Sequence, residues 1–81
     1  MATMKELRTA AGLSSYELAD VTGVTAPAVL RWESGISAPR MRLRPLAAKA
    51  LGVTVDELSK AVTATKAERI RRDLAGEKEI R

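Results

Sequence analysis

The feature that most constrains the fold of this chain is residues 13–35, which have the pattern of two short helices joined by a sharp turn. Ser14 is followed three residues later by Glu17, and this spacing is a capping box that starts a helix. Gly23 supplies the left-handed residue with which that helix ends. Because helices of about two turns do not bury a core by themselves, this unit needs further helices on both sides of it.

The second of the two short helices follows Thr25, whose hydroxyl can cap its first turn. Pro27 falls in that first turn, where a missing N–H costs nothing. Val29 and Trp32 are three residues apart and therefore share one face, so we interpret Trp32 as a core residue and not as a stacking residue for a cofactor. Gly35 ends the helix, and we expect its leading end to protrude.

The Ser/Thr-x-x-Glu spacing occurs four times, each time at the start of a segment with helical periodicity. The four pairs are Thr3/Glu6, Ser14/Glu17, Thr54/Glu57 and Thr65/Glu68. We therefore predict an all-α fold, a compact five-helix bundle followed by a C-terminal helical extension. The expected helices cover about residues 4–11, 15–22, 26–34 and 45–51, with a fifth capped by Thr54. The bundle is assigned to residues 1–60 and the charged amphipathic extension to residues 61–81, with a hinge at residues 61–64.

Two features of the loop after Gly35 also lead to predictions. Ile36 is expected to fill the edge of the core, since it is the large aliphatic residue of that loop. Residues 40–44 alternate basic and apolar side chains, which can mean a strand, but Pro45 follows at once. We interpret residues 40–44 as an extended approach to the next helix, with Pro45 in its first turn.

Composition excludes several classes of function. The chain has no Cys and no His, so a disulfide framework, a thiolate metal site and a histidine general base are absent. We expect no enzymatic activity, no metal and no cofactor, because the remaining reactive side chains form no paired arrangement. No apolar run approaches the ~20 residues of a membrane span. The N-terminus lacks the apolar segment of a signal peptide, so a soluble protein is expected.

Several recurring positions of a known family are present in combination. They are Leu18-Ala19, Ala19-x3-Gly23-x5-Val29, Gly23-Val24, Trp32-Glu33-x-Gly35 and Leu51-Gly52-Val53. Over about residues 4–58 the chain resembles the helix-turn-helix of the phage repressor and Cro family, the XRE-type DNA-binding proteins. The resemblance implies a cytoplasmic, nucleoid-associated, repressor-like regulator that binds double-stranded DNA by occupancy, with a homodimer as the working unit on DNA.

The resemblance also implies that the helix at about residues 26–34 enters the major groove with its N-terminal residues at the base edges. The positions carried over as base-contacting are Ala26, Pro27, Ala28, Leu30 and Arg31. The chain has no Asn and no Gln, so the usual bidentate contact to adenine is excluded. Arg31 can bind guanine, and the apolar residues can contact thymine methyls, with DNA shape adding to the specificity. Leu30 has a second interpretation as a protein-binding residue.

Basic residues gather beside this motif. The net charge is +4, and between Arg31 and Lys49 five basic residues stand against one acid, Glu33. Next to a helix-turn-helix this stretch indicates contact with the phosphate backbone, although a solvated face is the alternative. The candidate phosphate contacts are Ser15, Ser34, Arg40, Arg42 and Arg44.

Two further predictions concern packing. The resemblance implies that Arg8 and Glu33 form a partly buried structural ion pair. In the C-terminal segment, Ala67, Ile70 and Leu74 make a narrow apolar stripe, which must pack on its own domain or on a second copy, or else the helix frays. We take this stripe as the candidate dimer element. The alternative function is a protein-interaction module or an antitoxin, whose scaffold and C-terminal helix bind a protein partner.

Overall fold

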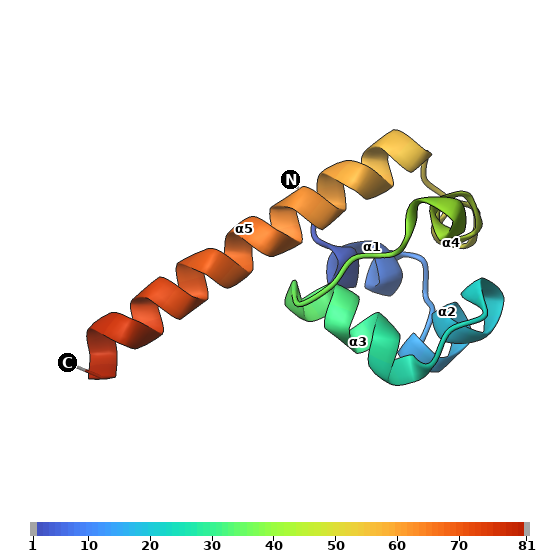
Figure 1. The fold of residues 1–81 in the computed structure, drawn as a ribbon. Coiled ribbons are helices and arrows are strands. Elements are labelled where there is room, and N and C mark those ends of the chain that lie inside the picture. The colour runs from blue at the N-terminus through green and yellow to red at the C-terminus, as the bar shows by residue number, and fades with distance from the viewer. Residues whose placement is uncertain (1, 81) are drawn as a thin grey trace.

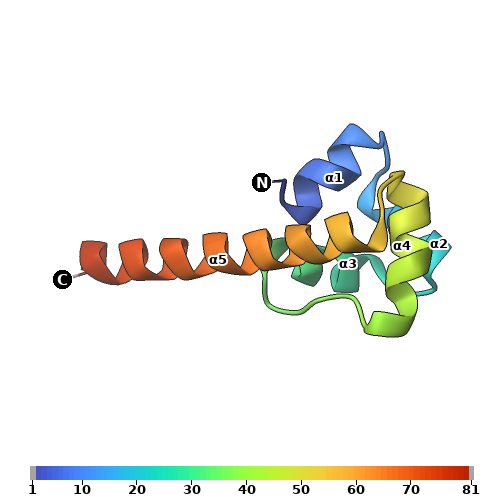
Figure 2. The same ribbon diagram turned by 90° about the horizontal axis from the view of Figure 1, so that it is seen from above.

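The computed structural model describes residues 2–80, with side chains described as far as residue 76, and within that range the regular structure is entirely helical. The elements are α1 (Met4–Ala10), α2 (Ser15–Thr22), α3 (Ala26–Ser34), the single 3₁₀ turn η1 (Met41–Leu43), α4 (Arg44–Leu51) and α5 (Val55–Ile80). Helices α1 to α4 and the start of α5 form a bundle, from which the rest of α5 projects, as Figures 1 and 2 show. The molecule measures 43 × 23 × 23 Å. The predicted all-α bundle with a helical extension is confirmed.

Three of the four predicted capping boxes are present at helix starts. At α2, the Glu17 N–H donates to Ser14 Oγ at 3.1 Å and the Ser14 N–H donates to Glu17 Oε1 at 2.9 Å. The same reciprocal pair of bonds starts α1 and α5, from Thr3/Glu6 and Thr54/Glu57. In α3, the Ala28 N–H donates to Thr25 Oγ1 at 3.3 Å. These caps fix where each helix begins, because they satisfy N–H groups that have no partner inside the helix.

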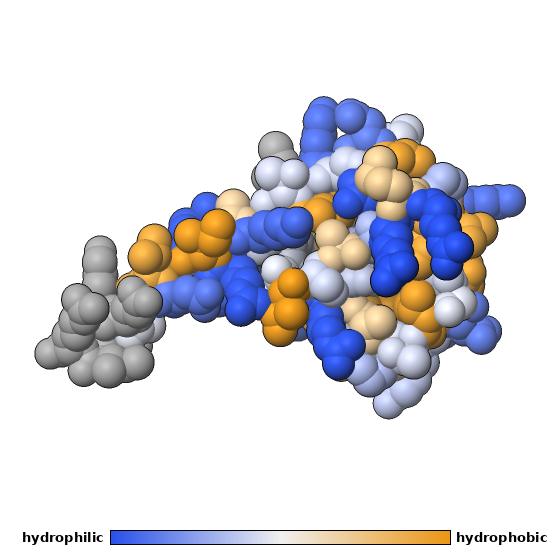
Figure 3. Space-filling model, viewed as in Figure 1, coloured by the Kyte–Doolittle hydropathy of each residue, from blue (hydrophilic) through white to orange (hydrophobic). Residues whose placement is uncertain are grey.

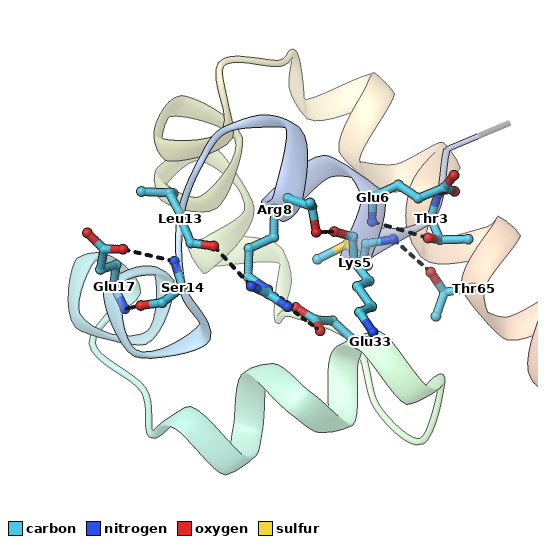
Figure 4. Close-up of polar contacts among 11 residues, drawn as sticks. Thr3, Lys5, Glu6, Arg8, Leu13, Ser14, Glu17, Glu33 and Thr65 are labelled. Carbon is cyan, nitrogen blue, oxygen red and sulfur yellow. Dashed lines mark hydrogen bonds and ion pairs between the residues drawn. The ribbon is translucent and has the colours of Figure 1, made fainter.

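The fourth box, Thr65/Glu68, was predicted wrongly, since Thr65 lies inside α5 and starts no helix. Its hydroxyl donates to the Ala61 carbonyl at 2.8 Å and accepts the Met4 N–H at 3.0 Å, and both bonds are buried. Figure 4 shows Thr65 beside the start of α1. The threonine thus caps α1 from a distance, which spacing along the chain cannot reveal.

The hinge expected at residues 61–64 was also predicted wrongly, because α5 is continuous from Val55 to Ile80. Ala61 and Val62 are 1% and 7% exposed and belong to the core. The helix therefore crosses the expected boundary between residues 60 and 61 without a break, and packing holds it straight there. The i,i+4 spacing of Glu68 with Arg72 and of Glu77 with Arg81 also predicts two ion pairs in this segment. Glu77 and Arg81 lie outside the residues whose side chains are described.

The core is built from small aliphatic residues of all five helices around Trp32. Its fully buried centre includes Val29, Ala47 and Leu58, each 0% exposed, and Trp32 is 5% exposed, which confirms its assignment to the core. Leu7, Ala11, Leu13, Val24, Ala38, Ala50 and Val53 are among the partly buried residues packed around it. Apart from Trp32 these side chains are aliphatic and many are short, which lets the helices approach closely.

The loop between α3 and α4 differs from both predictions made for it. Ile36 is 61% exposed, and Pro39 is the loop residue that is fully buried. After the left-handed Gly35, the Ile36 N–H returns to the Arg31 carbonyl at 3.1 Å, which turns the isoleucine side chain outward. The extended approach expected at residues 40–44 was predicted wrongly, because only Arg40 is extended and residues 41–43 form the 3₁₀ turn η1.

Candidate nucleic-acid interface

The turn between α2 and α3 sets the angle at which α3 is presented. Gly23 has a φ of 73°, in the left-handed region, and its N–H donates to the Ala19 and Asp20 carbonyls. The next N–H, of Val24, donates to Ala19 O at 3.0 Å, which completes a tight helix end. Thr25 is extended and caps α3 immediately afterwards. Two residues between Gly23 and α3 leave little freedom, so α2 and α3 cross in a fixed geometry.

An ion pair between Arg8 and Glu33 attaches α3 to α1, as expected from the family resemblance. The Arg8 Nε donates to Glu33 Oε2, and the Arg8 Nη2 donates to Glu33 Oε1 at 3.1 Å, which makes the pair bidentate. The Arg8 Nη1 donates to the Leu13 carbonyl at 2.9 Å (Figure 4). The hydrogen bonds that Arg8 donates to Glu33 raise the pKa of Arg8. The side chains are only 16% and 7% exposed, so loss of either partner would leave the other charge poorly solvated.

Helix α3 has an inner and an outer face. Val29 and Trp32 point into the core, and Glu33 points towards α1. Four residues lie on the opposite side of the helix at spacings of three and four, and we call them the outer ridge: Pro27, Leu30, Arg31 and Ser34. Figure 1 shows α3 along one edge of the bundle, on the side away from α4. An exposed helix at an edge can enter a groove of duplex DNA.

The five candidate base-contacting residues divide into two groups in the structure. Pro27, Leu30 and Arg31 are exposed on the outer ridge, with Leu30 52% exposed. Ala26 is half-buried and packs against the core, and Ala28 is half-buried and lines a hollow between α3 and the loop that precedes α4. The outer ridge therefore presents two apolar side chains and one guanidinium near the leading end of α3.

The five candidate phosphate contacts also occupy different surroundings. Arg40 and Arg42 are exposed, and Ser15 is the first residue of α2, close to its unpaired N–H groups. The Ser34 hydroxyl donates to the Arg31 carbonyl at 3.1 Å. Arg44 is part-buried, and its Nε donates to the Pro39 carbonyl at 3.0 Å while its Nη1 donates to Ser59 Oγ at 3.1 Å. Arg44 thus connects the loop to α5. This structural role could not be told from the sequence, where Arg44 belongs to the same run of arginines as Arg40 and Arg42.

Sequence reasoning missed contacts from α5 to the end of α3. The Arg72 Nη2 donates to the Ser34 carbonyl at 3.3 Å, and the ion pair expected from Arg72 to Glu68 is replaced by one from Arg69 to Asp73, with N···O 3.5 Å. A cation at the C-terminus of a helix is favourable because carbonyl groups there lack partners. Tyr16, beside Ser15 at the start of α2, is 76% exposed and was also missed. No local spacing marks the contact of Arg72 with Ser34, since it joins two elements that are 38 positions apart in the chain.

In the stretch from residue 31 to residue 49, every exposed charged side chain is basic. The single acid of this stretch, Glu33, is turned inward and neutralised by Arg8, while Arg31, Arg40, Arg42 and Lys49 are exposed. Figure 3 shows strongly hydrophilic side chains over this part of the bundle and apolar ones along the projecting helix. The surface around the outer ridge therefore attracts polyanions.

Within the described residues, no group of three or more acidic side chains could hold a metal ion. None of the helices there is both long enough and apolar enough to cross a membrane.

Comparison with known proteins gives one match. A family model described as a helix-turn-helix matches residues 4–58, from the start of α1 into the first turn of α5. Neither the search of curated proteins nor the search of solved structures gives a match. The matched range contains the outer ridge, the Arg8–Glu33 pair and the exposed arginines.

Proposed function

Because the chain belongs to the XRE-type helix-turn-helix family, we propose that it is a sequence-specific regulator of transcription that binds double-stranded DNA. In this proposal it acts as a repressor or Cro-like protein, by occupying its site and without chemistry. Helix α3 lies in the major groove with Pro27, Leu30 and Arg31 at the base edges. Arg40, Arg42, Ser15 and Ser34 contact phosphates, and Ala26 and Ala28 allow the helix to approach closely.

One observation carries the proposal. The only acid between residues 31 and 49 is removed from the surface by its pairing with Arg8, so the exposed charges of that stretch all have one sign. A helix presented at an edge with basic side chains around it has the electrostatic footprint of a DNA-binding surface. Arg44 is held by the Pro39 carbonyl and by Ser59, and in this proposal it orients the loop that carries Arg40 and Arg42.

We propose a dimer because of the side of α5 on which the apolar stripe lies. At 3.6 residues per turn, Ala67, Ile70 and Leu74 lie on the opposite side of the helix from the buried Ala61 and Thr65. Ala67 is half-buried and lines a hollow beside Thr3, whereas Ile70 and Leu74 are 59% and 55% exposed and do not pack on their own bundle. We propose that the stripe pairs with a second copy when two protomers occupy half-sites one helical turn apart, about 34–36 Å.

Enrichment of random duplexes against the full chain tests the proposal, followed by measurement of affinity over a range of salt. We expect an enriched palindrome and an affinity that falls with a slope of about −0.9 per neutralised phosphate on a log–log plot. The double variant R40A/R42A should reduce that slope by about two. R31A should instead relax the preference at one base pair of each half-site, a contact worth roughly 1–3 kcal/mol.

Lys60→Ala provides the matched control, since it removes one exposed positive charge on α5 whose partner is Asp56, on the same helix. It should change neither the salt slope nor the base preference beyond the small effect of net charge. Failure of the chain to retain any duplex in dilute buffer, or a nearly salt-independent affinity, would contradict the proposal.

The exposed stripe on α5 favours one alternative, in which the C-terminal helix binds a protein partner, as in an antitoxin. Light scattering of the double variant I70S/L74S separates the two. If the wild-type protein is dimeric and the variant is monomeric, the stripe is the dimer interface. A wild-type protein that remains monomeric even on its palindromic site would leave the stripe to a partner protein.

A further inference from the structure

We propose that the outer ridge of α3 reads the 5-methyl group of a pyrimidine that lies next to a guanine. The half-site would then contain thymine or 5-methylcytosine beside that guanine, and the protein would respond to cytosine methylation at that step. This inference rests on the proposed function and specifies the class of duplex that it selects.

The leading end of the ridge is apolar. It presents Pro27, which has no N–H to donate, and Leu30, whose side chain is 52% exposed. Neither residue can make a hydrogen bond to a base edge through its side chain. In the major groove the only apolar group on a base edge is the methyl at C5 of thymine. 5-Methylcytosine carries the same methyl on the same ring atom, so an apolar reader meets the same group there.

Arg31 comes directly after Leu30 in the chain. Both side chains are exposed on the same ridge, so they reach neighbouring positions on the floor of the groove. Arginine binds guanine O6 and N7 bidentately, the commonest specific contact in the major groove. With Arg31 on a guanine, Leu30 lies over the adjacent pyrimidine, since consecutive base pairs are about 3.4 Å apart along a strand. The pair of residues therefore selects a two-base step and not two separate bases.

The ridge carries no side-chain amide and no acid among Pro27, Leu30, Arg31 and Ser34. The chain contains no Asn and no Gln, so no side-chain amide is available to recognise adenine. Glu33, an acid that could accept from cytosine N4, is held inward by Arg8 and cannot reach the groove. Leu30 can therefore distinguish pyrimidines only by whether they carry the methyl group.

Four duplexes that differ at one pyrimidine of the enriched site test this inference with the full chain. Thymine and deoxyuridine differ only by the methyl, and so do 5-methylcytosine and cytosine, each with its complementary base opposite. We expect about a fourfold loss of affinity within each pair when the methyl is removed, which is what burial of one such group is worth. The two ratios should be equal, because the same side chain contacts the same group.

Variants assign the effect to Leu30. Leu30→Ala should bring both ratios close to one, while Leu30→Met, which keeps an apolar side chain of similar length, should retain them. Leu46, on α4, is 48% exposed and is the matched control, so Leu46→Ala should leave both ratios at the wild-type value. R31A should remove the guanine preference and keep the methyl ratios.

The outcomes separate this inference from the proposed function. If the duplex is bound with a normal salt slope but both ratios stay near one, the methyl reading is overturned and DNA binding stands. Methyl reading by Leu30 is likewise overturned if Leu30→Ala leaves both ratios unchanged, as it would if Leu30 served a protein partner. If none of the four duplexes is retained at low salt, both proposals fail together.

Discussion

The two halves of α5 have similar residues and opposite surroundings. In the first half Leu58 and Ala61 are 0% and 1% exposed and form part of the core. In the second half Ile70 and Leu74 are 59% and 55% exposed, on the other side of the same helix. The apolar face thus moves from one side of the helix to the other near Thr65. A single helix both completes the bundle and carries an apolar surface away from it.

The second half of α5, which carries the exposed apolar surface, also contacts the end of α3. The Arg72 Nη2 reaches the Ser34 carbonyl, and a Cβ placed on Gly35 would lie 3.0 Å from the Cβ of Arg69 and 3.2 Å from the Thr65 carbonyl. Helix α5 therefore braces α3 from behind while the outer ridge stays free. The exposed side chains in the second half of α5 therefore do not mean that the helix is frayed, because its other side contacts the end of α3.

The largest expected effect on stability comes from replacing a leucine by alanine in the first half of α5, and the same replacement in the second half serves for comparison. Leu58→Ala should lower the free energy of unfolding by about 2–5 kcal/mol, because it leaves a cavity in the core. Leu74→Ala should change it by less than about 0.5 kcal/mol, because that side chain is already solvated in the monomer. Urea unfolding at a protein concentration that keeps the chain monomeric measures both. Equal losses would show that α5 does not divide as described.

A second test concerns the contact between α3 and α5. Gly35→Ala should destabilise the fold by roughly 2–3 kcal/mol, since φ is +82° there and the new Cβ would press on Arg69 and on the Thr65 carbonyl. Gly12 has a φ of +73° with nothing within 4 Å of its Cβ position, so Gly12→Ala should cost only the backbone strain, about 1 kcal/mol. The difference between the two thermal melts isolates the packing of α5 on α3. A Gly35→Ala loss no larger than that of Gly12→Ala would mean that this packing is loose.

The third test uses two threonines in the first half of α5. Thr65→Val removes the acceptor for the Met4 N–H and should cost about 1–3 kcal/mol, the penalty for an unpaired buried donor. Thr63 is exposed and bonds only to the Ser59 carbonyl of its own helix, so Thr63→Val should have little effect. Chemical denaturation gives the difference, and hydrogen exchange at Met4 should rise selectively in the Thr65 variant.

Local signals in the sequence predict most of the fold. Ser14 with Glu17 and Gly23 define α2 because caps and left-handed glycines act within one turn of the chain, and their residue types reveal them. The face of α3 follows from the spacing of Val29 and Trp32 for the same reason. Once Val29 and Trp32 are assigned to the inner face of α3, the residues on the other side of the helix must be exposed. The position of the outer ridge can therefore be predicted from the sequence.

The remaining features depend on partners far away in the chain. Thr65 with Glu68 satisfies the capping pattern, yet its hydroxyl bonds to a residue 61 positions away. Arg44 has the same sequence surroundings as Arg42, but only Arg44 meets Ser59 and a buried loop carbonyl. Pro39 replaces Ile36 in the core because the chain turns at Gly35. In each case tertiary contact overrode a correct local rule.

The smallest expected effect is a pH dependence at the start of the buried half of α5. The Thr54 N–H donates to the Glu57 carboxylate at 3.0 Å, and this bond is the main reason why the pKa of Glu57 is lowered. A lowered pKa in the folded state means that the charged carboxylate adds stability above its ordinary pKa, about 4.3, and that this stability is lost as the pH falls through the lower value. Glu57→Gln keeps an oxygen acceptor but does not titrate. We therefore expect the wild-type protein to melt above E57Q at pH 7 and the two melting curves to converge in acid below pH ~4, whereas a gap that stayed constant with pH would mean that the charge of Glu57 does not stabilise this end of α5.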